Sequence, residues 1–467
     1  MKQLLTIAFS LLALSTNAHN TAVLKGMVSN PISDSIHISY ITDFFSFQSN
    51  KEHIALDKNG AFSVTLSFDD DYLDVDILHG NQSTELVVTN GSEITLTLDA
   101  ANFDSTIQYT GNGSEIANFC AKHVLEEGPV FSYTSKAAMM FSKEKKDFAE
   151  QLDMMAKEKA AYIESESSLT DNFKQYWKNK FVYNNYYLEL MYPTVHKQFK
   201  PKDGQGTDVD DIILTKIPKE TFNDEYISVP EYKIFVYNYI GGEFVKNKTT
   251  PETELHTADS IMQVMILKLP HETAEYGLAN ILCQMSKIYS LTTIEHLYSK
   301  YRKHFPNGKY SAPIENAIAI KTNTGKGKPA MNFTATTSDG KTVSLSELKG
   351  KVVYIDFWAS WCTPCIRELP HSKKVSEHFA GNDKVVFLSI SIDQDKNSWK
   401  SAIDKYKIPG INAIDGNGWE GTIARLYHVQ SVPSYFLVDK NGNFALDRTL
   451  RPSDEEALIS AIEALVK

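Results

Sequence analysis

Residues 352–365 read VVYIDFWASWCTPC, and this stretch decides the fold of the C-terminal part of the chain. An apolar run, residues 352–358, predicts a buried strand, and the Cys-x-x-Cys pair after it opens a segment with helical spacing. A sulfur on the first turn of a helix faces unpaired backbone N–H groups and the positive end of the helix dipole, which stabilise its thiolate. Because the thiolate is the form that attacks a disulfide, this order predicts a dithiol redox site. Cys362 is the expected attacking thiol, and Cys365, on the same side of the helix, is expected to resolve the mixed disulfide.

The cysteine pair has two other interpretations, half of a zinc site and a purely structural bridge. Zinc takes four ligands, and the chain has neither a second Cys-x-x-Cys pair nor two histidines at ligand spacing. Asp203–Asp211 is rich in aspartate but lacks the glutamate and the register of a calcium-binding loop. We therefore favour the redox interpretation, and we expect neither a metal nor another cofactor.

From about Gly327 to the C-terminus, the chain resembles the periplasmic or membrane-tethered thioredoxin-like reductases of the TlpA/ResA type. Three motifs carry the resemblance: YIDFWAS at residues 354–360, IRELP at 366–370 and SVPSYFLVD at 431–439. The resemblance implies a thioredoxin-like α/β domain with thiol–disulfide oxidoreductase activity. It also implies protein disulfides as substrates and an electron donor, unidentified here, such as a membrane thiol–disulfide relay.

The other elements of this part follow the order of the family. We expect a buried strand over residues 385–392, helices over 398–406, 419–427 and 453–466, and a hairpin turn at 439–442. Ser453 is the expected N-cap of the last helix, because Glu456 three residues later completes a capping box.

Two carboxylates near the cysteines are candidate proton acceptors. Asp356 lies inside the apolar strand, where burial would raise its pKa toward the range useful for proton transfer. Glu368 lies one helical turn after Cys365. The resemblance matches Asp356 to the buried aspartate of thioredoxins and Glu368 to the active-site glutamate of the TlpA/ResA group. We expect Glu368 to take the proton of Cys365, because a helix position follows the sulfur closely. The alternatives are that Glu368 is a surface charge and that Asp356 is a capped strand end.

Val432-Pro433 is the expected second half of the site. In the family this proline bond is cis, and the backbone before it pairs with an extended substrate peptide. An ordinary trans proline at the end of a strand is the alternative. Trp361, next to the nucleophile, is expected to offer protein substrates an exposed aromatic surface, whereas Trp358 is expected in the core.

Length and composition limit the number of domains and the classes of partner. A chain of 467 residues is too long for one hydrophobic core and predicts two or three domains. A hydrophobic content of 42% with 22% charged residues is typical of a globular protein. The net charge of −11 argues against a nucleic-acid partner and against an anionic membrane surface.

Residues 1–18 are typical of a secretory signal peptide. Lys2 precedes an apolar stretch from Leu4 to Leu14, and Thr16-Asn17-Ala18 forms a small-residue cleavage site. No later stretch reaches 18 apolar residues, so we expect no transmembrane span in the mature protein. The expected location is outside the cytoplasm, most simply a bacterial periplasm, which is kept oxidising.

The chain before the redox domain divides by its sequence pattern. Residues 19–112 alternate apolar and polar residues between turns such as Asp57–Gly60, which predicts a small antiparallel β-sandwich or barrel. This segment resembles the domain of unknown function that often precedes thioredoxin domains in exported proteins of Bacteroidota-type bacteria. Residues 113–321 have helical periodicity, residues 322–328 form the expected linker, and residues 329–467 form the thioredoxin-like domain.

Two features of the helical region have two interpretations each. Residues 171–192 are densely aromatic and form either a groove for unfolded protein or a helix–helix core. We favour the core, because apolar stripes on helices normally face other helices. Cys120 and Cys283, the remaining cysteines, could pair in an exported protein, but we favour buried free thiols.

Several functions are compatible with these features. The leading hypothesis is an exported thiol–disulfide oxidoreductase that reduces protein disulfides. A disulfide isomerase or oxidase is an alternative, because the compartment does not set the redox direction, and the reduction potential separates these activities. A peroxidase is disfavoured, because both cysteines lie in one Cys-x-x-Cys pair. A further alternative is a partner-specific binding protein in which the first 325 residues recognise the partner and the redox domain is accessory.

Overall fold

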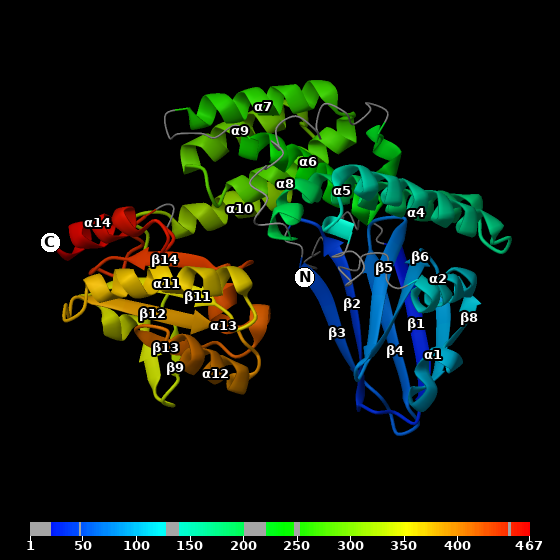
Figure 1. The fold of residues 1–467 in the computed structure, drawn as a ribbon, viewed down its shortest axis with the longest axis horizontal. Helices are drawn as coiled ribbons and strands as arrows, with labels where there is room; N and C mark the ends of the chain where they lie inside the picture. The colour runs from blue at the N-terminus through cyan, green and yellow to red at the C-terminus, as the bar shows by residue number, and fades with distance from the viewer. Residues whose placement is uncertain (1–19, 46–47, 128–139, 200–220, 247–252, 447–449) are drawn as a thin grey trace, which may run out of the picture. The chain divides into compact units, whose positions relative to one another are not determined.

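The computed structural model describes residues 20–45, 48–127, 140–199, 221–246, 253–446 and 450–467 (Figure 1). The chain divides into two compact units, one within residues 1–218 and 225–235 and the other within residues 219–224 and 236–467. The predicted signal peptide and the aspartate-rich stretch at 203–211 lie outside the described residues. Within the described ranges, no helix is both long and apolar enough to cross a membrane.

The first unit contains a β-sandwich of two four-stranded sheets, with strand orders β4-β1-β7-β8 and β3-β2-β5-β6. The strands are β1 (Asn20–Ser29), β2 (Ser35–Asp43), β3 (Gln48–Ala55), β4 (Ala61–Phe68), β5 (Tyr72–His79), β6 (Gln82–Thr89), β7 (Glu93–Asp99) and β8 (Gln108–Asn112). Apolar residues at alternate positions face inward, so that Leu24, Ile77 and Leu96 are buried in one core. The predicted sandwich is confirmed, but it is not wholly antiparallel, because β1 and β7 pair in parallel.

Helices follow the sandwich in the first unit. They are α1 (Phe103–Thr106), α2 (Ser114–Glu127), α4 (Lys145–Ser165) and α5 (Asp171–Phe199). On α5, Phe173, Tyr176 and Trp177 are buried. The Trp177 ring meets the Phe119 ring of α2 edge-on, with centroids 5.0 Å apart. The core interpretation of this aromatic segment is therefore confirmed.

The second unit begins with further helices. They are α6 (Pro230–Lys246), whose first residues belong to the first unit, α7 (Glu254–Lys268), α8 (His271–Met285), α9 (Leu291–His304) and α10 (Ser311–Thr324). Every residue of α8 from Thr273 to Cys283 is buried, as expected of a helix surrounded by others. A Cβ atom at Gly277 would lie 2.3 Å from Cδ1 of Ile240, so this glycine permits the close approach of α6 and α8. The helical region is confirmed, and α10 includes the first residues of the predicted linker.

The C-terminal part of the second unit is a six-stranded mixed sheet with the order β10-β9-β13-β12-β11-β14. Its strands are β9 (Thr334–Thr337), β10 (Thr342–Ser344), β11 (Val352–Trp358), β12 (Val385–Ser391), β13 (Ile411–Ile414) and β14 (Ser434–Val438). β11, β12 and β13 are parallel, and β14 runs antiparallel to β11. β11 is buried at all seven positions, as a strand covered on both faces should be.

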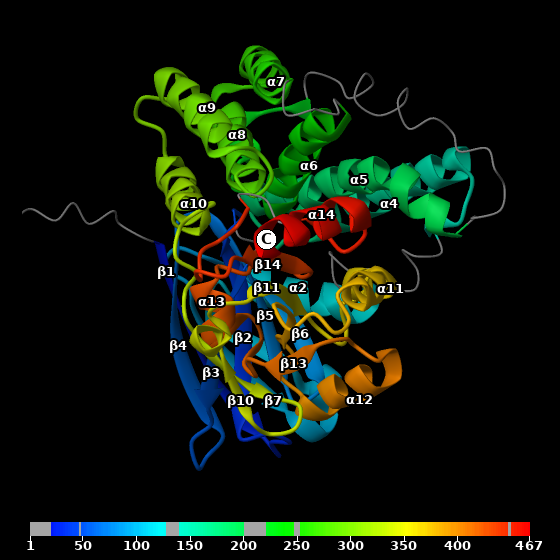
Figure 2. The ribbon, with the colours of Figure 1, turned by 90° about the vertical axis from the view of Figure 1, so that its left-hand side faces the viewer.

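Helices cover both faces of this sheet (Figure 2). They are α11 (Thr363–His378), α12 (Lys396–Tyr406), α13 (Thr422–Leu426) and α14 (Glu455–Val466). Val375 of α11 and Leu458 of α14 belong to one core cluster, whereas Trp399 of α12 and Ile423 of α13 belong to the other. The predicted α/β fold of this part is confirmed.

The predicted start of the last helix is wrong. α14 begins at Glu455 after Asp454 as N-cap. Ser453 does not cap this helix, because its hydroxyl and its backbone N–H both bond to Glu368 instead.

The predicted helix over residues 419–427 is divided in two. A 3₁₀ turn, Gly418–Glu420, precedes α13. The Asp415 carboxylate accepts hydrogen bonds from the backbone N–H groups of Ile423 and Ala424, at 2.9 and 2.8 Å. These are free N–H groups of a new helix start, so the carboxylate favours a second helix over one continuous helix.

Candidate active site

Cys362 and Cys365 lie at the N-terminus of α11 and form a disulfide with an S–S distance of 2.12 Å. Cys362 is the N-cap residue of the helix, and its Sγ accepts a hydrogen bond from the backbone N–H of Cys365 at 3.1 Å. Pro364 stands in the first turn, where its missing N–H costs no helical hydrogen bond. The same N–H contact and the helix dipole would stabilise a thiolate on Cys362 after reduction.

The loop that leads into Cys362 is held by a buried carboxylate, Asp393, which follows β12. Asp393 is 2% exposed. It accepts hydrogen bonds from the backbone N–H and the hydroxyl of Ser360, at 2.9 and 2.7 Å, and from the hydroxyl of Ser391 at 2.7 Å. These bonds fix the position of the chain two residues before the first cysteine.

The Val432-Pro433 peptide bond is cis, as predicted. It lies beside the disulfide, since the carbonyl oxygen of Val432 is 3.6 Å from Sγ of Cys362. The segment before β14 therefore brings a backbone edge next to the sulfur, although its role in substrate binding stays a prediction.

Two tryptophans lie near the cysteines on the surface. Trp361 is 58% exposed, and its ring meets the partly buried ring of Trp419 with centroids 6.1 Å apart. Trp358 is in the core, as predicted. Together, Trp361 and Trp419 form an aromatic surface next to Cys362.

Asp356 occupies the middle of β11 and is 8% exposed. Its neighbours across the sheet are Ser389 of β12 and Tyr435 of β14. Its Oδ1 has no hydrogen-bond partner among the described residues. Burial, together with the negative charge of Glu368, raises the pKa of Asp356 to about 7. This carboxyl group can therefore exchange a proton near neutral pH.

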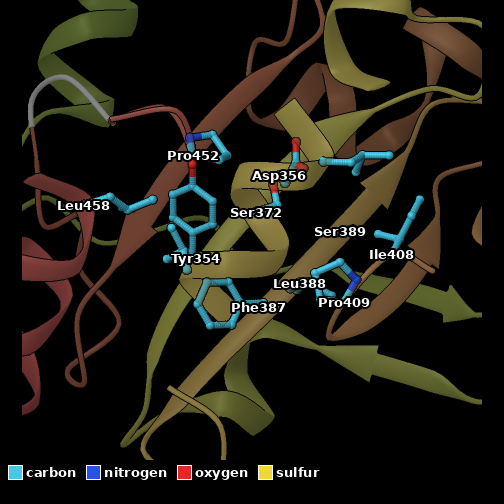
Figure 3. Close-up of a pocket in the computed structure, with 12 residues that line it drawn as sticks. Tyr354, Asp356, Ser372, Phe387, Leu388, Ser389, Ile408, Pro409, Pro452 and Leu458 are labelled. Carbon is cyan, nitrogen blue, oxygen red and sulfur yellow. The ribbon is translucent and has the colours of Figure 1, made fainter. Parts of the chain in front are cut away.

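A small cavity lies beside Asp356. Figure 3 shows Asp356 and Ser372 among the side chains that line it, together with Tyr354 and Pro452. Its volume is about 10 Å³, close to the room that one water molecule needs. The hydroxyl oxygen of Ser372 also has no hydrogen-bond partner among the described residues. The cavity thus joins two buried polar groups, one on β11 and one on α11.

Glu368 lies on α11 one turn after Cys365, and both of its carboxylate oxygens accept hydrogen bonds from Ser453. The backbone N–H of Ser453 donates to Oε2 at 2.9 Å, and its hydroxyl donates to Oε1 at 3.1 Å. Glu368 is therefore oriented toward the segment before α14, and it acts on Asp356 through its charge.

Comparison with known proteins identifies the family to which the sequence of this site belongs. A family model described as Redoxin matches residues 325–455. The thiol-disulfide oxidoreductase ResA of Bacillus subtilis (strain 168) is 30% identical over 130 residues, which cover 28% of this chain and 70% of that protein. The chain belongs to the thioredoxin-like thiol–disulfide oxidoreductases. The resemblance to the TlpA/ResA group is confirmed for its C-terminal part.

Further relatives match about a quarter to a third of this chain. ResA of Bacillus anthracis is 34% identical over 117 residues, so the match spans 25% of this chain and 65% of that protein. Among solved structures, a putative thiol:disulfide interchange protein DsbE from Chlorobium tepidum has 31% sequence identity to this chain. The match covers 30% of this chain and 98% of that chain, with a TM-score of 0.28. A putative thiol-disulfide oxidoreductase from Bacteroides vulgatus is 29% identical, covering 31% and 99%, with a TM-score of 0.29.

The structure brings some of the predicted site residues together. Cys362, Cys365 and Val432 meet at one place, and Trp361 flanks them. Asp356 is linked to Glu368 by charge. The roles of these residues stay predictions.

Three residues of the site were missed by the sequence analysis: Asp393, Trp419 and Ser453. A lone aspartate directly after an apolar strand could have revealed Asp393, because such a position lies at the carboxyl edge of the sheet. Ser453 gave no such signal, since its partner lies 85 residues away.

The two remaining cysteines lie outside the redox pair. Neither Cys120 nor Cys283 is in a disulfide, and both are buried and belong to different units, so the expectation that they do not pair and are buried is confirmed. Burial raises the pKa of the Cys120 thiol, which makes it unreactive. Among the described residues, no group of three or more His, Cys, Asp or Glu side chains is arranged to hold a metal ion.

Proposed function

We propose that this oxidoreductase is exported and reduces disulfide bonds of other proteins through the Cys362–Cys365 dithiol. The observation that carries the proposal is the position of Cys362 Sγ. It accepts the N–H of Cys365 at the start of α11 and lies 3.6 Å from the carbonyl oxygen of Val432. A thiolate is stabilised there, directly beside a backbone edge that an extended peptide can pair with.

The reaction has two thiol–disulfide exchanges. The Cys362 thiolate attacks one sulfur of the substrate disulfide, and the other substrate sulfur leaves as a thiolate and takes up a proton. Cys365 then loses its proton and attacks Cys362, which releases the second substrate thiolate and forms the Cys362–Cys365 disulfide. Two electrons pass from the dithiol to the substrate, and a donor of two electrons must restore the dithiol.

For the second exchange, we propose Asp356 as the proton acceptor. Its pKa is raised to about 7 by burial and by Glu368, and its Oδ1 has no partner among the described residues. Both oxygens of Glu368 are engaged by Ser453, which makes Glu368 the weaker candidate. This revises the expectation from the sequence, where Glu368 was favoured.

Export rests on the predicted signal peptide, residues 1–18. In an oxidising compartment a reductase needs a dedicated electron donor, and a membrane thiol–disulfide relay would serve. For substrate proteins, we propose that Trp361 and Trp419 provide the apolar contact and that the chain around Val432 provides the backbone contact.

The reduction potential of the pair tests the direction of the reaction. The full chain would be equilibrated with glutathione buffers and the dithiol fraction measured by thiol alkylation and mass spectrometry. A potential near that of thioredoxin, about −270 mV, is the expected result for a reductase. A potential near about −120 mV, typical of a strong oxidant, would overturn the proposal in favour of an oxidase.

A further inference from the structure

The first unit contains a hollow of about 380 Å³ that no redox chemistry explains. Residues of β2, β5 and β6 line it on one side, and residues of α2, α5 and α6 line it on the other. Its volume is in the range of small-molecule sites in proteins. We call it the acidic hollow, because six of its lining residues are carboxylates: Asp69, Asp70, Asp74, Asp76, Glu85 and Glu231.

Lysine side chains neutralise only part of this charge. Lys180, which is 5% exposed at its side chain, pairs with Asp74 and with Oε1 of Glu231, the latter at 3.2 Å. Lys233 pairs with Asp70. Asp76 and Glu85 have no ion pair among the described residues. The strand side of the acidic hollow therefore has two carboxyl groups that form no ion pair with a lysine.

Asp76 and Glu85 form an unfavourable pair. They stand directly opposite each other on β5 and β6, and like charges at such positions destabilise a sheet. Burial, and next the charge of Asp76, raises the pKa of Glu85 to about 7. A cation between the two carboxylates would remove the repulsion that this pairing creates.

Glu231 provides a second, independent indication of a ligand. Its side chain is only 3% exposed. One oxygen, Oε1, pairs with Lys180, but Oε2 is buried and has no hydrogen-bond partner among the described residues. A buried carboxylate oxygen without a donor is costly, and this one belongs to a residue that lines the acidic hollow.

The walls of the acidic hollow suit an organic cation better than a metal ion. The described residues include no cluster arranged to hold a metal. The lining includes the aromatic rings of Tyr40, Tyr72 and Trp177, which can cover the methylene groups of an aliphatic amine. Lys180 already places its ammonium group 5.9 Å from the centre of the Trp177 ring, so this wall accommodates such a group.

We propose that the acidic hollow binds a small organic polycation, an aliphatic molecule with two or more ammonium groups. Asp76 and Glu85 hold one ammonium group, and the other acidic residues that line the hollow attract the rest of the polycation. The N-terminal β-sandwich is then a ligand-binding domain.

Spermidine is a suitable probe for this site. Isothermal titration of the oxidised full chain at about 0.15 M ionic strength, where exposed charges are screened, should give saturable binding with one site per chain. Glu85→Gln should weaken the affinity about tenfold, because one charge-assisted hydrogen bond is lost, and Asp76→Asn should do the same. Glu93→Gln on β7, an exposed carboxylate of the other sheet, is the matched control and should leave the affinity unchanged.

Three results would overturn the proposal. One is the absence of saturable spermidine binding to a protein that is shown to be folded by a cooperative thermal unfolding transition. Another is equal weakening by Glu85→Gln and Glu93→Gln, which would indicate general surface attraction. The third is saturable, Glu85-dependent binding of Ca²⁺ in place of spermidine, which would indicate a metal site. Since the titration involves no thiol chemistry, its outcome is independent of the proposed reductase activity.

Discussion

Ser453 donates two hydrogen bonds to the carboxylate of Glu368, one from its backbone N–H at 2.9 Å and one from its hydroxyl at 3.1 Å. They connect α11, one turn after Cys365, to the segment just before α14. The oriented negative charge of Glu368 adds to burial in raising the pKa of Asp356. A surface serine is thereby connected to the buried carboxyl group that we propose as the proton acceptor.

Ser453→Ala should lower the free energy of unfolding of the C-terminal domain by about 0.5–1 kcal/mol, because one hydrogen bond to a partly exposed carboxylate is lost. Urea denaturation of the oxidised protein measures the change. Ser460→Ala, at an exposed position on α14, is the matched control and should change the stability by less than about 0.5 kcal/mol. Equal stabilities of the two variants would show that the Ser453 hydroxyl bond contributes nothing.

Asp356→Asn should slow the resolution of the mixed disulfide on the order of 100-fold, because a general base is removed from that step. Attack by Cys362 on the substrate should change much less. Rapid acid quench of a reaction with a peptide disulfide, followed by mass spectrometry, separates the two steps.

Glu368→Gln is the informative comparison for the same step. We expect resolution to slow by less than about tenfold, and the midpoint of its pH dependence to move below that of the wild type. The reason is that removal of the negative charge at Glu368 lowers the pKa of Asp356. A loss with Glu368→Gln that exceeds the loss with Asp356→Asn would return the role of base to Glu368.

The stability of the C-terminal domain should fall as the pH rises from about 4 to about 7. The pKa of Asp356 is raised from 3.8 to about 7 in the folded protein. Between these values the folded state holds a proton that the unfolded state has lost, so raising the pH favours unfolding. With about 1.4 kcal/mol for each pH unit, the full effect is on the order of 4 kcal/mol.

Hydrogen exchange of the β11 amides in the oxidised protein measures this effect for the C-terminal domain alone. Asp356→Asn should be more stable than the wild type at pH 8 and should lose most of that advantage at pH 5. Other titrating groups cancel in the difference between the two proteins. The same difference at both pH values would mean that Asp356 is ionised in the folded state as readily as in water.

The features that the sequence predicted are those that short segments of the chain determine. Alternation of apolar residues predicted the sandwich, and the Cys-x-x-Cys pair after an apolar run predicted that Cys362 begins a helix. The motif around Pro433 predicted the cis bond through family resemblance. In each case the residues that determine the structure lie within a few positions of one another.

The features that the sequence did not predict depend on partners far along the chain. Ser453 has the local pattern of an N-cap, but its hydrogen bonds to Glu368, 85 residues away, replace that role. Asp393 meets Ser360 only because β11 and β12 are adjacent in the sheet. Local propensity cannot identify such pairs, since tertiary packing decides between competing partners of the same hydroxyl or carboxylate.

Trp361→Ala should raise the KM for a protein disulfide substrate about tenfold while kcat changes little, because an exposed aromatic contact for the substrate is removed. Reduction of insulin measures this. Glutathione disulfide, which has no apolar side chain to place on the aromatic surface, should be reduced at the wild-type rate. Leu267→Ala, which removes a side chain that is 82% exposed on α7, is the control for general loss of apolar surface. An unchanged KM for insulin would remove Trp361 from the substrate surface.

Replacing Cys362 and replacing Cys365 should have different effects on the reaction. Cys365→Ser keeps the attacking sulfur at the N-terminus of α11, so the reduced variant should form a mixed disulfide with insulin that persists, detectable by non-reducing electrophoresis and mass spectrometry. Cys362→Ser should form no such adduct and should reduce nothing, because Cys362 is the sulfur at the N-cap of α11 beside the carbonyl oxygen of Val432, whereas Cys365 lies inside the first turn of the helix. Cys283→Ala, which removes a buried thiol that is in no disulfide and lies outside the site, should leave the reaction as in the wild type. If the adduct instead accumulated on Cys365 in the Cys362→Ser variant, Cys365 would be the attacking thiol, which is the reverse of the proposed order. The hydrogen bond from Cys365 N–H to Cys362 Sγ would then not stabilise the attacking thiolate.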